Sequence, residues 1–171
     1  MAAFKTAFDK MIQNEGGYKL HSVEGDRGGQ TYAGIARNYN PTWQGWLFID
    51  NQKMDHPDLT MVVAEFYQSN YWDKVRGGEI ESQHVAESLF DFAVNAGTKT
   101  ASKLAQIAVG AAPDGVIGPQ TLKSISAVDE ELFVLKYALA KVARYAEICN
   151  RDRGQSKFLL GWTNRTIKGL S

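Results

Sequence analysis

The segment at residues 85–96 is apolar around most of the circumference of a helix, and it constrains the fold more than any other part of the chain. Its apolar side chains recur at three- and four-residue spacing or stand beside those positions: Val85, Ala86, Leu89, Phe90, Phe92, Ala93, Val94 and Ala96. A helix that is apolar on nearly every side must be buried by neighbouring elements. We therefore expect a central helix here, surrounded by other helices.

The other periodic segments predict a mainly α fold. Apolar residues recur at helical spacing in further stretches: residues 4–15, 59–71, 104–108 and 132–149. The last stretch carries one long apolar stripe: Leu132, Leu135, Leu139, Val142, Ala146 and Cys149. We expect this stripe to pack against the central helix. A coiled-coil dimer is the alternative, but so short a stripe favours packing within the chain. Residues 22–34 are rich in glycine and predict an irregular loop or a short β-hairpin.

The length of 171 residues fits one domain, or a lobe with a small companion. A predicted boundary near residues 96–100 separates a candidate catalytic lobe, residues 1–97, from a smaller helical lobe, residues 98–171. No Pro-, Gly- or Ser-rich linker lies between them. We therefore expect the two lobes to pack together rather than move on a tether.

Composition argues against several classes of function. Lys plus Arg and Asp plus Glu both number 19, so no net charge favours nucleic acid or an anionic membrane. No apolar run is long enough to span a membrane, and the N-terminus shows no secretory signal. A single cysteine, Cys149, fits synthesis in the cytoplasm, and the three His residues lack metal-ligand spacing. We expect no metal and no other cofactor.

Glu15 is the first candidate for chemistry. It shares a helix face with Phe4, Phe8 and Met11, and it stands at the C-terminal end of that helix, before Gly16. Burial and the negative end of the helix dipole both favour the protonated carboxyl, the form that donates a proton to a leaving glycosidic oxygen. Periodicity alone favours the alternative, an exposed Glu at a helix end. The loop that follows changes this balance.

Asp26 lies among glycines in that loop, and Thr31 follows five positions later. A solvated, ionised Asp26 opposite a protonated Glu15 would give the two carboxyl environments that glycosidases use. Thr31 would then orient a water or hold the substrate. The alternative for Asp26 is a turn residue that bonds to its own backbone, and without Glu15 we would prefer it.

Several motifs, taken in their order along the chain, resemble those of a known family. They are Glu-Gly-Gly-Tyr at residues 15–18, Asp-Arg-Gly-Gly-Gln-Thr-Tyr-Ala-Gly-Ile at 26–35, Tyr-Trp-Asp at 71–73, Phe-Asp-Phe-Ala-Val-Asn-Ala-Gly at 90–97 and Asp-Gly-Val-Ile-Gly-Pro-Gln-Thr at 114–121. The ordered set closely resembles glycoside hydrolase family 108. The last motif is similar to the predicted peptidoglycan-binding region that usually completes these chains.

The resemblance implies a lysozyme-like fold and hydrolysis of the bond between N-acetylmuramic acid and N-acetylglucosamine. The family's catalytic acid falls on Glu15, and the roles of Asp26 and Thr31 rest on analogy with phage-type lysozymes. Arg27 stands where the family usually has Pro. Members occur in prophages and beside secretion systems, so we expect delivery by a holin or a secretion system. We expect the protein to act on peptidoglycan glycan strands in the periplasm, as a monomer.

Five residues are candidates for substrate binding: Tyr18, Tyr71, Trp72, Asp91 and Asn95. Asp91 and Asn95, with Ser88, form a polar stripe on the central helix, which either lines a solvated groove or satisfies buried partners. Tyr71 and Trp72 suit stacking on sugar rings, although aromatics at helical spacing are more often core. Tyr18 comes from the Glu-Gly-Gly-Tyr motif.

Two other functions fit the same sequence. The first is a non-catalytic, peptidoglycan-binding secretion accessory protein that has kept the fold. The second is a lytic transglycosylase, which closes the muramic acid on itself instead of admitting water. An ionised Asp26 beside Thr31 suits water activation and favours hydrolysis, whose stereochemical outcome depends on the separation of the two carboxyl groups.

Overall fold

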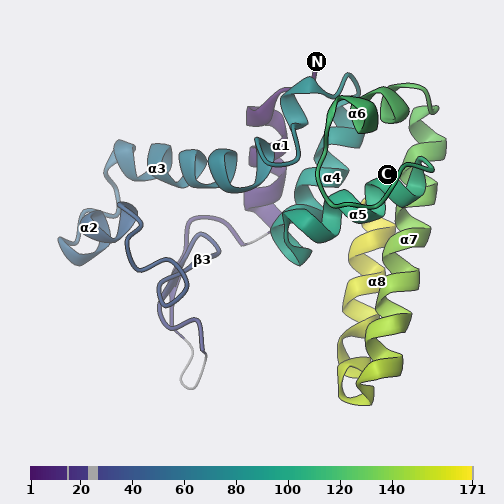
Figure 1. Cartoon of the computed structure of the whole chain (residues 1–171). Coiled ribbons are helices and arrows are strands. Elements are labelled where there is room, and N and C mark those ends of the chain that lie inside the picture. The colour runs from purple at the N-terminus through teal and green to yellow at the C-terminus, as the bar shows by residue number, and fades with distance from the viewer. Residues whose placement is uncertain (15, 23–26, 171) are drawn as a thin grey trace. The chain divides into compact units, whose positions relative to one another are not determined.

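The computed structural model describes residues 1–14, 16–22 and 27–170. These residues form two compact units, each with its own internal packing (Figure 1). The N-terminal unit is Phe4–Asn70, and the C-terminal unit is Tyr71–Ser171 together with Met1–Ala3. The first three residues belong to the C-terminal unit because the amide of Ala2 donates to the carbonyl of Ile80 at 2.8 Å.

The N-terminal unit combines helices with a small sheet. Its elements are α1 (Phe4–Asn14), β1 (Leu20–His21), β2 (Thr31–Tyr32), β3 (Ile35–Ala36), α2 (Gly45–Asp50) and α3 (Pro57–Tyr67), after which the π-helix η1 (Gln68–Trp72) runs on into the next unit. The three strands are antiparallel in the order β1-β2-β3, with Leu20 opposite Tyr32 and Thr31 opposite Ala36. The glycine-rich stretch thus contributes a hairpin strand, as the sequence predicted.

The turn between β2 and β3 is fixed by backbone conformation and by one buried hydrogen bond. Ala33 and Gly34 have φ values of 49° and 80°, the left-handed pair that a two-residue hairpin turn requires. The hydroxyl of Tyr67, at the end of α3, donates to the carbonyl of Ala33 at 2.8 Å. The helix therefore holds the turn in place.

An aromatic cluster forms much of the core of the N-terminal unit. Trp43 meets Trp46 edge to face at 5.1 Å between ring centroids, and it meets Phe66 at 6.2 Å. The ring nitrogens also have partners, since Trp46 donates to the carbonyl of Asn40 at 2.7 Å. Trp43 and Trp46 thus pack in the core, as the sequence predicted.

The C-terminal unit is built entirely of helices among the residues described. Its elements are η2 (Gly77–Glu79), α4 (Gln83–Ala96), α5 (Thr98–Ala108), α6 (Pro119–Ser126), α7 (Glu130–Arg151), η3 (Arg153–Phe158) and α8 (Leu159–Lys168). Ser82 caps α4 by accepting from the amide of Val85, and Asp129 caps α7 by accepting from the amide of Leu132. The helices α7 and α8 run side by side in opposite directions as a hairpin (Figure 1).

The helix α4 is the buried central helix that the sequence predicted. Leu89, Phe90 and Ala93 are fully buried, and α4 packs against α5 and α7 within the C-terminal unit. The boundary that the sequence suggested near residue 97 therefore joins two helices that pack closely, while the compact units divide near residue 70.

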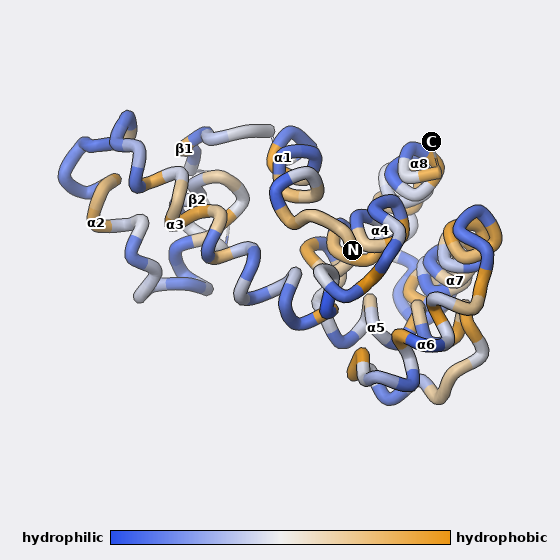
Figure 2. The backbone as a smooth tube through the Cα atoms, turned by 90° about the horizontal axis from the view of Figure 1, so that it is seen from above, coloured by the Kyte–Doolittle hydropathy of each residue, from blue (hydrophilic) through white to orange (hydrophobic). Residues whose placement is uncertain are grey.

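The prediction for the packed face of α7 is wrong. Leu132, Leu135, Leu139 and Val142 are exposed, Leu139 by 70%. The buried face is instead aromatic and polar: Phe133, Val134, Tyr137, Lys141, Tyr145 and Cys149. The alternation of blue and orange along α7 in Figure 2 follows its amphipathic sequence.

The physical reason lies in the size of the side chains on the buried face. Aromatic rings remove more surface from water than leucines do, and the hydroxyl of the fully buried Tyr137 also donates to the carbonyl of Ala101 on α5 at 3.2 Å. Cys149, which the sequence grouped with the leucine stripe, lies on the buried face, and its expected role in packing is confirmed.

Gln106 organises the loop that carries the motif at residues 114–121. Its side-chain amide nitrogen lies 2.7 Å from Asp114 Oδ1, 3.0 Å from the carbonyl of Val116 and 3.2 Å from Thr121 Oγ1. Its oxygen accepts from the amide of Gly115 at 2.9 Å. Gln106 and Thr121 are buried, so these motif residues make the internal contacts of a folded loop.

No helix among the described residues is long and apolar enough to cross a membrane.

Candidate active site

The predicted acid Glu15 and its predicted partner Asp26 both lie outside the described residues. The residues around position 15 show how the helix before it ends. Gly16 and Gly17 have φ values of 88° and 80°. The amide of Gly17 donates to the carbonyl of Ile12 at 2.8 Å, and that of Gly16 donates to Gln13 at 3.2 Å, the pattern of a Schellman motif. Both glycines are needed because other residues disfavour this backbone conformation.

Thr31 lies on β2, where it is almost completely buried. Its hydroxyl is 3.4 Å from the carbonyl of Gly29, a long hydrogen bond inside its own loop. This contact shapes the turn, and the catalytic role of Thr31 stays a prediction.

Tyr18 is the predicted substrate-binding residue in the N-terminal unit. Tyr18 is 41% exposed, so part of the residue is open to solvent. Partial burial raises the pKa of its phenol, and the nearby Asp9 and Tyr32 raise it further. Tyr18 therefore stays neutral and can donate a hydrogen bond.

Trp72 has a packing role in the C-terminal unit that does not fit the predicted stacking on a sugar. Its side chain is only 3% exposed and meets Phe90 of α4 edge to face at 5.6 Å between centroids. A Cβ added at Gly77 would approach the indole ring to 2.6 Å, so the ring fills the space above that glycine. Its neighbour Tyr71 is half-buried.

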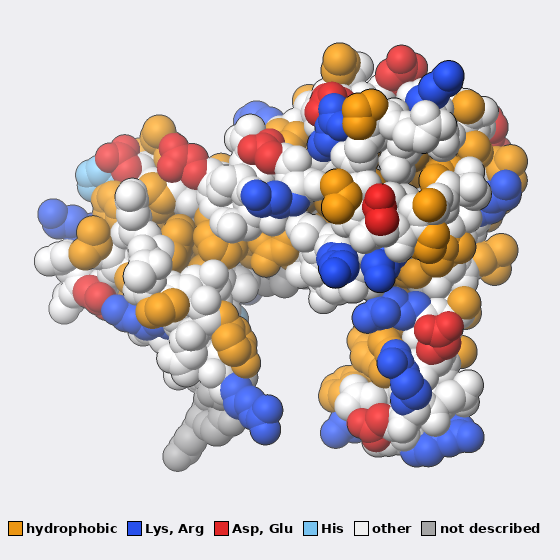
Figure 3. Space-filling view, in the orientation of Figure 1, with side chains coloured by type: hydrophobic (Ala, Val, Ile, Leu, Met, Phe, Trp, Pro, Cys, Tyr) orange, Lys and Arg blue, Asp and Glu red, His pale blue; other side chains and the backbone are white. Residues whose placement is uncertain are grey.

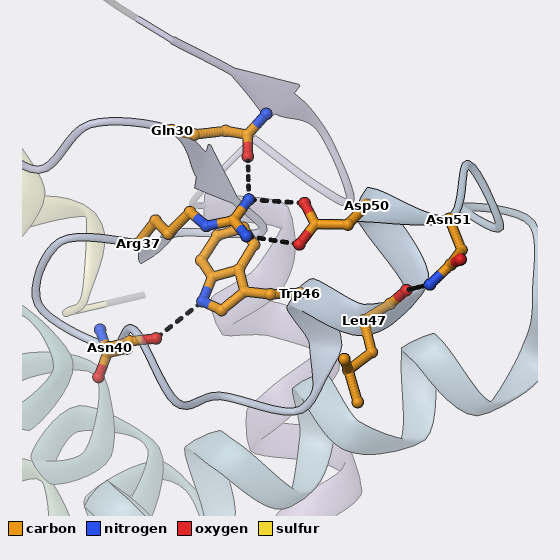
Figure 4. Close-up of polar contacts among 7 residues, drawn as sticks. All are labelled: Gln30, Arg37, Asn40, Trp46, Leu47, Asp50 and Asn51. Carbon is orange, nitrogen blue, oxygen red and sulfur yellow. Dashed lines mark hydrogen bonds and ion pairs between the residues drawn. The ribbon is translucent and has the colours of Figure 1, made fainter.

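Arg37 holds the segment between β3 and α2 in the N-terminal unit (Figure 4). Its guanidinium donates two hydrogen bonds to Asp50, at 2.8 and 2.6 Å, and a third to Gln30 at 2.9 Å. The same group lies 4.9 Å from the ring of Trp46. The hydrogen bonds from Arg37 lower the pKa of Asp50, which keeps this carboxylate ionised. Sequence analysis missed this cluster, which braces the loop and offers no acid for catalysis.

Asp91 and Asn95 are brought together, one turn apart on α4, at a cavity of about 250 Å³. The cavity lies between three helices of the C-terminal unit, and its polar wall is formed by Asp91, Asn95, Lys141, Arg144, Arg165 and Thr166. In Figure 3, Lys and Arg side chains gather over the α7–α8 hairpin. The sequence left two alternatives for the polar stripe of α4, a solvated groove or hydrogen bonding within the protein. Asp91 and Asn95 do both, because they line this cavity and also form hydrogen bonds with the protein.

The contacts at the cavity leave an excess of positive charge. Asp91 is engaged by Arg165, with Nη2 at 2.9 Å and Nε at 3.3 Å from its two oxygens. Asn95 donates back to the carbonyl of Asp91 at 2.7 Å. Within the described ranges, neither Lys141 nor Arg144 lies within 4 Å of a carboxylate.

Lys141 is an unusual feature of this cavity, because its side chain is almost completely buried. Its Nζ lies 3.3 Å from the hydroxyl of Ser88, 4.3 Å from the ring centroid of Tyr137 and 5.1 Å from that of Phe92. Burial lowers the pKa of Lys141 to about 8, with Asp91 opposing the shift. Sequence analysis missed Lys141; the one signal that could have indicated it is its four-residue spacing from the aromatic residues Phe133, Tyr137 and Tyr145.

The residues described by the structure contain no group of three or more His, Cys, Asp or Glu side chains placed to hold a metal ion. Of the predicted site residues, Tyr18 and Thr31 belong to the N-terminal unit, while Tyr71, Trp72, Asp91 and Asn95 belong to the C-terminal unit.

The helix α1, the small antiparallel sheet and the buried α4 within a mainly α chain define a lysozyme-like fold. Among solved structures, the chain is similar to the structure of Brucella abortus SagA, with 26% sequence identity and a TM-score of 0.71. The match covers 98% of this chain and 91% of that one. The predicted fold class is therefore confirmed.

Family comparison gives the more specific assignment. The family described as glycosyl hydrolase 108 matches residues 8–97, more than half of the chain, and the chain belongs to this family. A second family, described as a predicted peptidoglycan domain, matches residues 100–167. A search of curated proteins finds no match. The protein is a peptidoglycan hydrolase or a peptidoglycan-binding protein, and its first matched region is that of a glycoside hydrolase.

Proposed function

We propose that the protein is an N-acetylmuramidase that hydrolyses the β-1,4 bond between N-acetylmuramic acid and N-acetylglucosamine. The observation that carries this proposal is the glycosyl hydrolase 108 match over residues 8–97, which contains the Glu-Gly-Gly-Tyr motif at residues 15–18. The predicted peptidoglycan domain at residues 100–167 supports the same substrate.

In this mechanism Glu15 is the general acid. It protonates the glycosidic oxygen as the bond to the muramic acid breaks, and positive charge develops on the sugar ring. Asp26, as a carboxylate, stabilises that charge or activates the attacking water, and Thr31 orients the water. We assign Tyr18 to substrate binding, where its neutral phenol would donate a hydrogen bond to the sugar.

The first test is Glu15→Gln, which keeps the shape of the side chain and removes the proton donor. Loss of a general acid alone reduces turnover by roughly 100-fold or more. Cleavage is measured as soluble muropeptides released from purified peptidoglycan. The matched control is Glu65→Gln, at an exposed position on α3, which should cleave like the wild type. Near-normal turnover by Glu15→Gln would remove this residue from the mechanism.

The second test separates chemistry from adhesion in the loop. Asp26→Asn and Thr31→Ala should lower kcat more than they weaken sedimentation with insoluble peptidoglycan, because both residues are assigned to the reacting bond. If both variants turn over at the wild-type rate, these residues only shape the loop.

Mass spectrometry of the products distinguishes the alternatives. A muramidase adds water and leaves a reducing N-acetylmuramic acid, whereas a lytic transglycosylase leaves a 1,6-anhydro end that is lighter by one water. A non-catalytic accessory protein releases neither product. Because the substrate lies outside the cytoplasm, we propose that a holin or a secretion system delivers the protein to the wall, where it acts as a monomer.

A further inference from the structure

We propose that the cavity between α4, α7 and α8 binds a carboxylate of the peptide stems that branch from peptidoglycan. This inference rests on the proposed function, because it names the part of that same substrate which the C-terminal unit holds. The cavity is formed only by residues of this unit, and its polar wall combines Lys141, Arg144 and Arg165 with one acid, Asp91.

The excess of positive charge at the cavity favours the binding of an anion. Asp91 is already bound by two nitrogens of Arg165, so it has little capacity left for Lys141 or Arg144. Among the residues described, Lys141 and Arg144 form no ion pair of their own. A buried ammonium is costly unless an opposite charge comes close, and a bound carboxylate would supply that charge. Arg144 adds a planar guanidinium, which suits the two oxygens of a carboxylate.

The size and the apolar wall of the cavity favour a single amino-acid unit over a stretch of glycan. At about 250 Å³ the cavity is smaller than the roughly 300–1,000 Å³ of pockets that hold drug-sized ligands. One side is formed by Trp162 and Tyr145, whose ring centroids lie 5.3 Å apart. A short aliphatic chain next to a carboxylate matches this combination of aromatic surface and positive charge.

Within peptidoglycan, the peptide stem offers that chemistry. N-Acetylglucosamine carries no charge, so it can accept a hydrogen bond from a buried ammonium but cannot neutralise it. The γ-glutamyl and diamino-acid residues of the stem carry free carboxylates beside short aliphatic chains. Wall phosphate polymers are also anionic but lack an aliphatic carboxylate unit, so inorganic phosphate serves as the comparison probe.

The test is an NMR titration of the full chain with the tripeptide L-Ala-γ-D-Glu-meso-diaminopimelate. The indole signal of Trp162, assigned through Trp162→Phe, reports on the cavity. We expect a saturable shift of this signal with the tripeptide, and no saturable shift with chitotriose or inorganic phosphate. Arg144→Gln should weaken tripeptide binding by about tenfold or more, because a hydrogen bond between two charged groups is lost. Lys136→Gln, at an exposed position on the same helix and outside the cavity, should bind like the wild type.

Three results would overturn the proposal. They are no shift of the Trp162 signal with tripeptide, equal tripeptide binding by a folded Arg144→Gln, and equally tight binding of inorganic phosphate, which would make the cavity a general anion site. Amide signal dispersion establishes that Arg144→Gln is folded. Wall cleavage is measured separately. Tripeptide binding without glycan cleavage would refute the muramidase activity and support the carboxylate site. Cleavage without tripeptide binding would support the muramidase activity and refute the carboxylate site.

Discussion

Replacing Lys141 with Met tests whether a buried, unpaired ammonium stands at the centre of the C-terminal unit. The ammonium faces Ser88, Phe92 and Asp91 on α4, Tyr137, Arg144 and Tyr145 along α7, and Arg165 on α8. Met has nearly the same length and no charge. The substitution therefore removes the cost of burying the charge while keeping most of the packing.

The effect depends on pH, and its sign follows from the two protonation equilibria. Burial lowers the pKa of Lys141 from 10.5 to about 8 in the folded protein. Between these values the unfolded chain binds more protons than the folded one, so the free energy of unfolding of the wild type rises with pH. Over the whole window the rise is about 3 kcal/mol, at about 1.4 kcal/mol per pH unit, and most of it falls between pH 7 and pH 10.

The two proteins should therefore differ in a way that changes with pH. At pH 7 the Met variant avoids burying a charge, but it loses the hydrogen bond to Ser88, worth about 1 kcal/mol, and ring contacts worth roughly 0.5–2 kcal/mol. We expect its stability at pH 7 to equal or slightly exceed that of the wild type. By pH 10 the wild type should have gained roughly 2.5 kcal/mol relative to the variant.

Urea unfolding of both proteins at half-unit steps from pH 7 to pH 10 measures this difference. Subtracting one curve from the other cancels the titration of groups that both proteins share, including Tyr137, whose pKa is raised well above 10 by burial. Lys136→Met, at an exposed position on the same helix, is the control and should show no such trend. A difference that stays constant across the range would show that the ammonium of Lys141 is not desolvated, and the reasoning would fail.

Two further substitutions test the fold. Gln106→Leu should destabilise the protein by roughly 2–4 kcal/mol in urea, since it leaves Asp114 and the buried Thr121 without a shared partner; a loss below 0.5 kcal/mol would contradict the loop contacts. Leu139→Gln should change stability by no more than about 0.5 kcal/mol, because this side chain is 70% exposed; a loss of 2 kcal/mol or more would return it to a packed face.

The sequence predicted the central helix well because its pattern leaves no choice. A segment that is apolar on nearly every side has no solvent-facing orientation, so its burial follows from composition alone. The helix α7 carries two candidate faces, a leucine stripe and an aromatic one containing Lys141. Simple hydrophobicity favours the leucines, and only the three-dimensional packing of Tyr137 against α5 shows that the aromatic face is buried.

The candidate site divides in the same way. Glu15 and Asp26 came from local signals, a helix end and a glycine-rich loop, together with a family motif that is read directly along the chain. The cavity brings together Asp91, Lys141 and Arg165, which are far apart in sequence. No local pattern links them, because which helix faces meet is decided by packing rather than by spacing. Lys141 was not predicted either, because it lies on the face of α7 opposite the leucine stripe that was expected to pack.

The loop at residues 114–121 bears on how the C-terminal unit contacts the wall. By resemblance this motif belongs to a predicted peptidoglycan-binding region, and residues 100–167 match that family. Yet the side chains of Asp114 and Thr121 are hydrogen-bonded to Gln106, inside the loop. Polar groups that are already hydrogen-bonded within the protein are poor candidates for binding a ligand. The proposed binding of peptidoglycan by this unit therefore depends on other groups, and the cavity contains two that have no carboxylate partner among the described residues, Lys141 and Arg144.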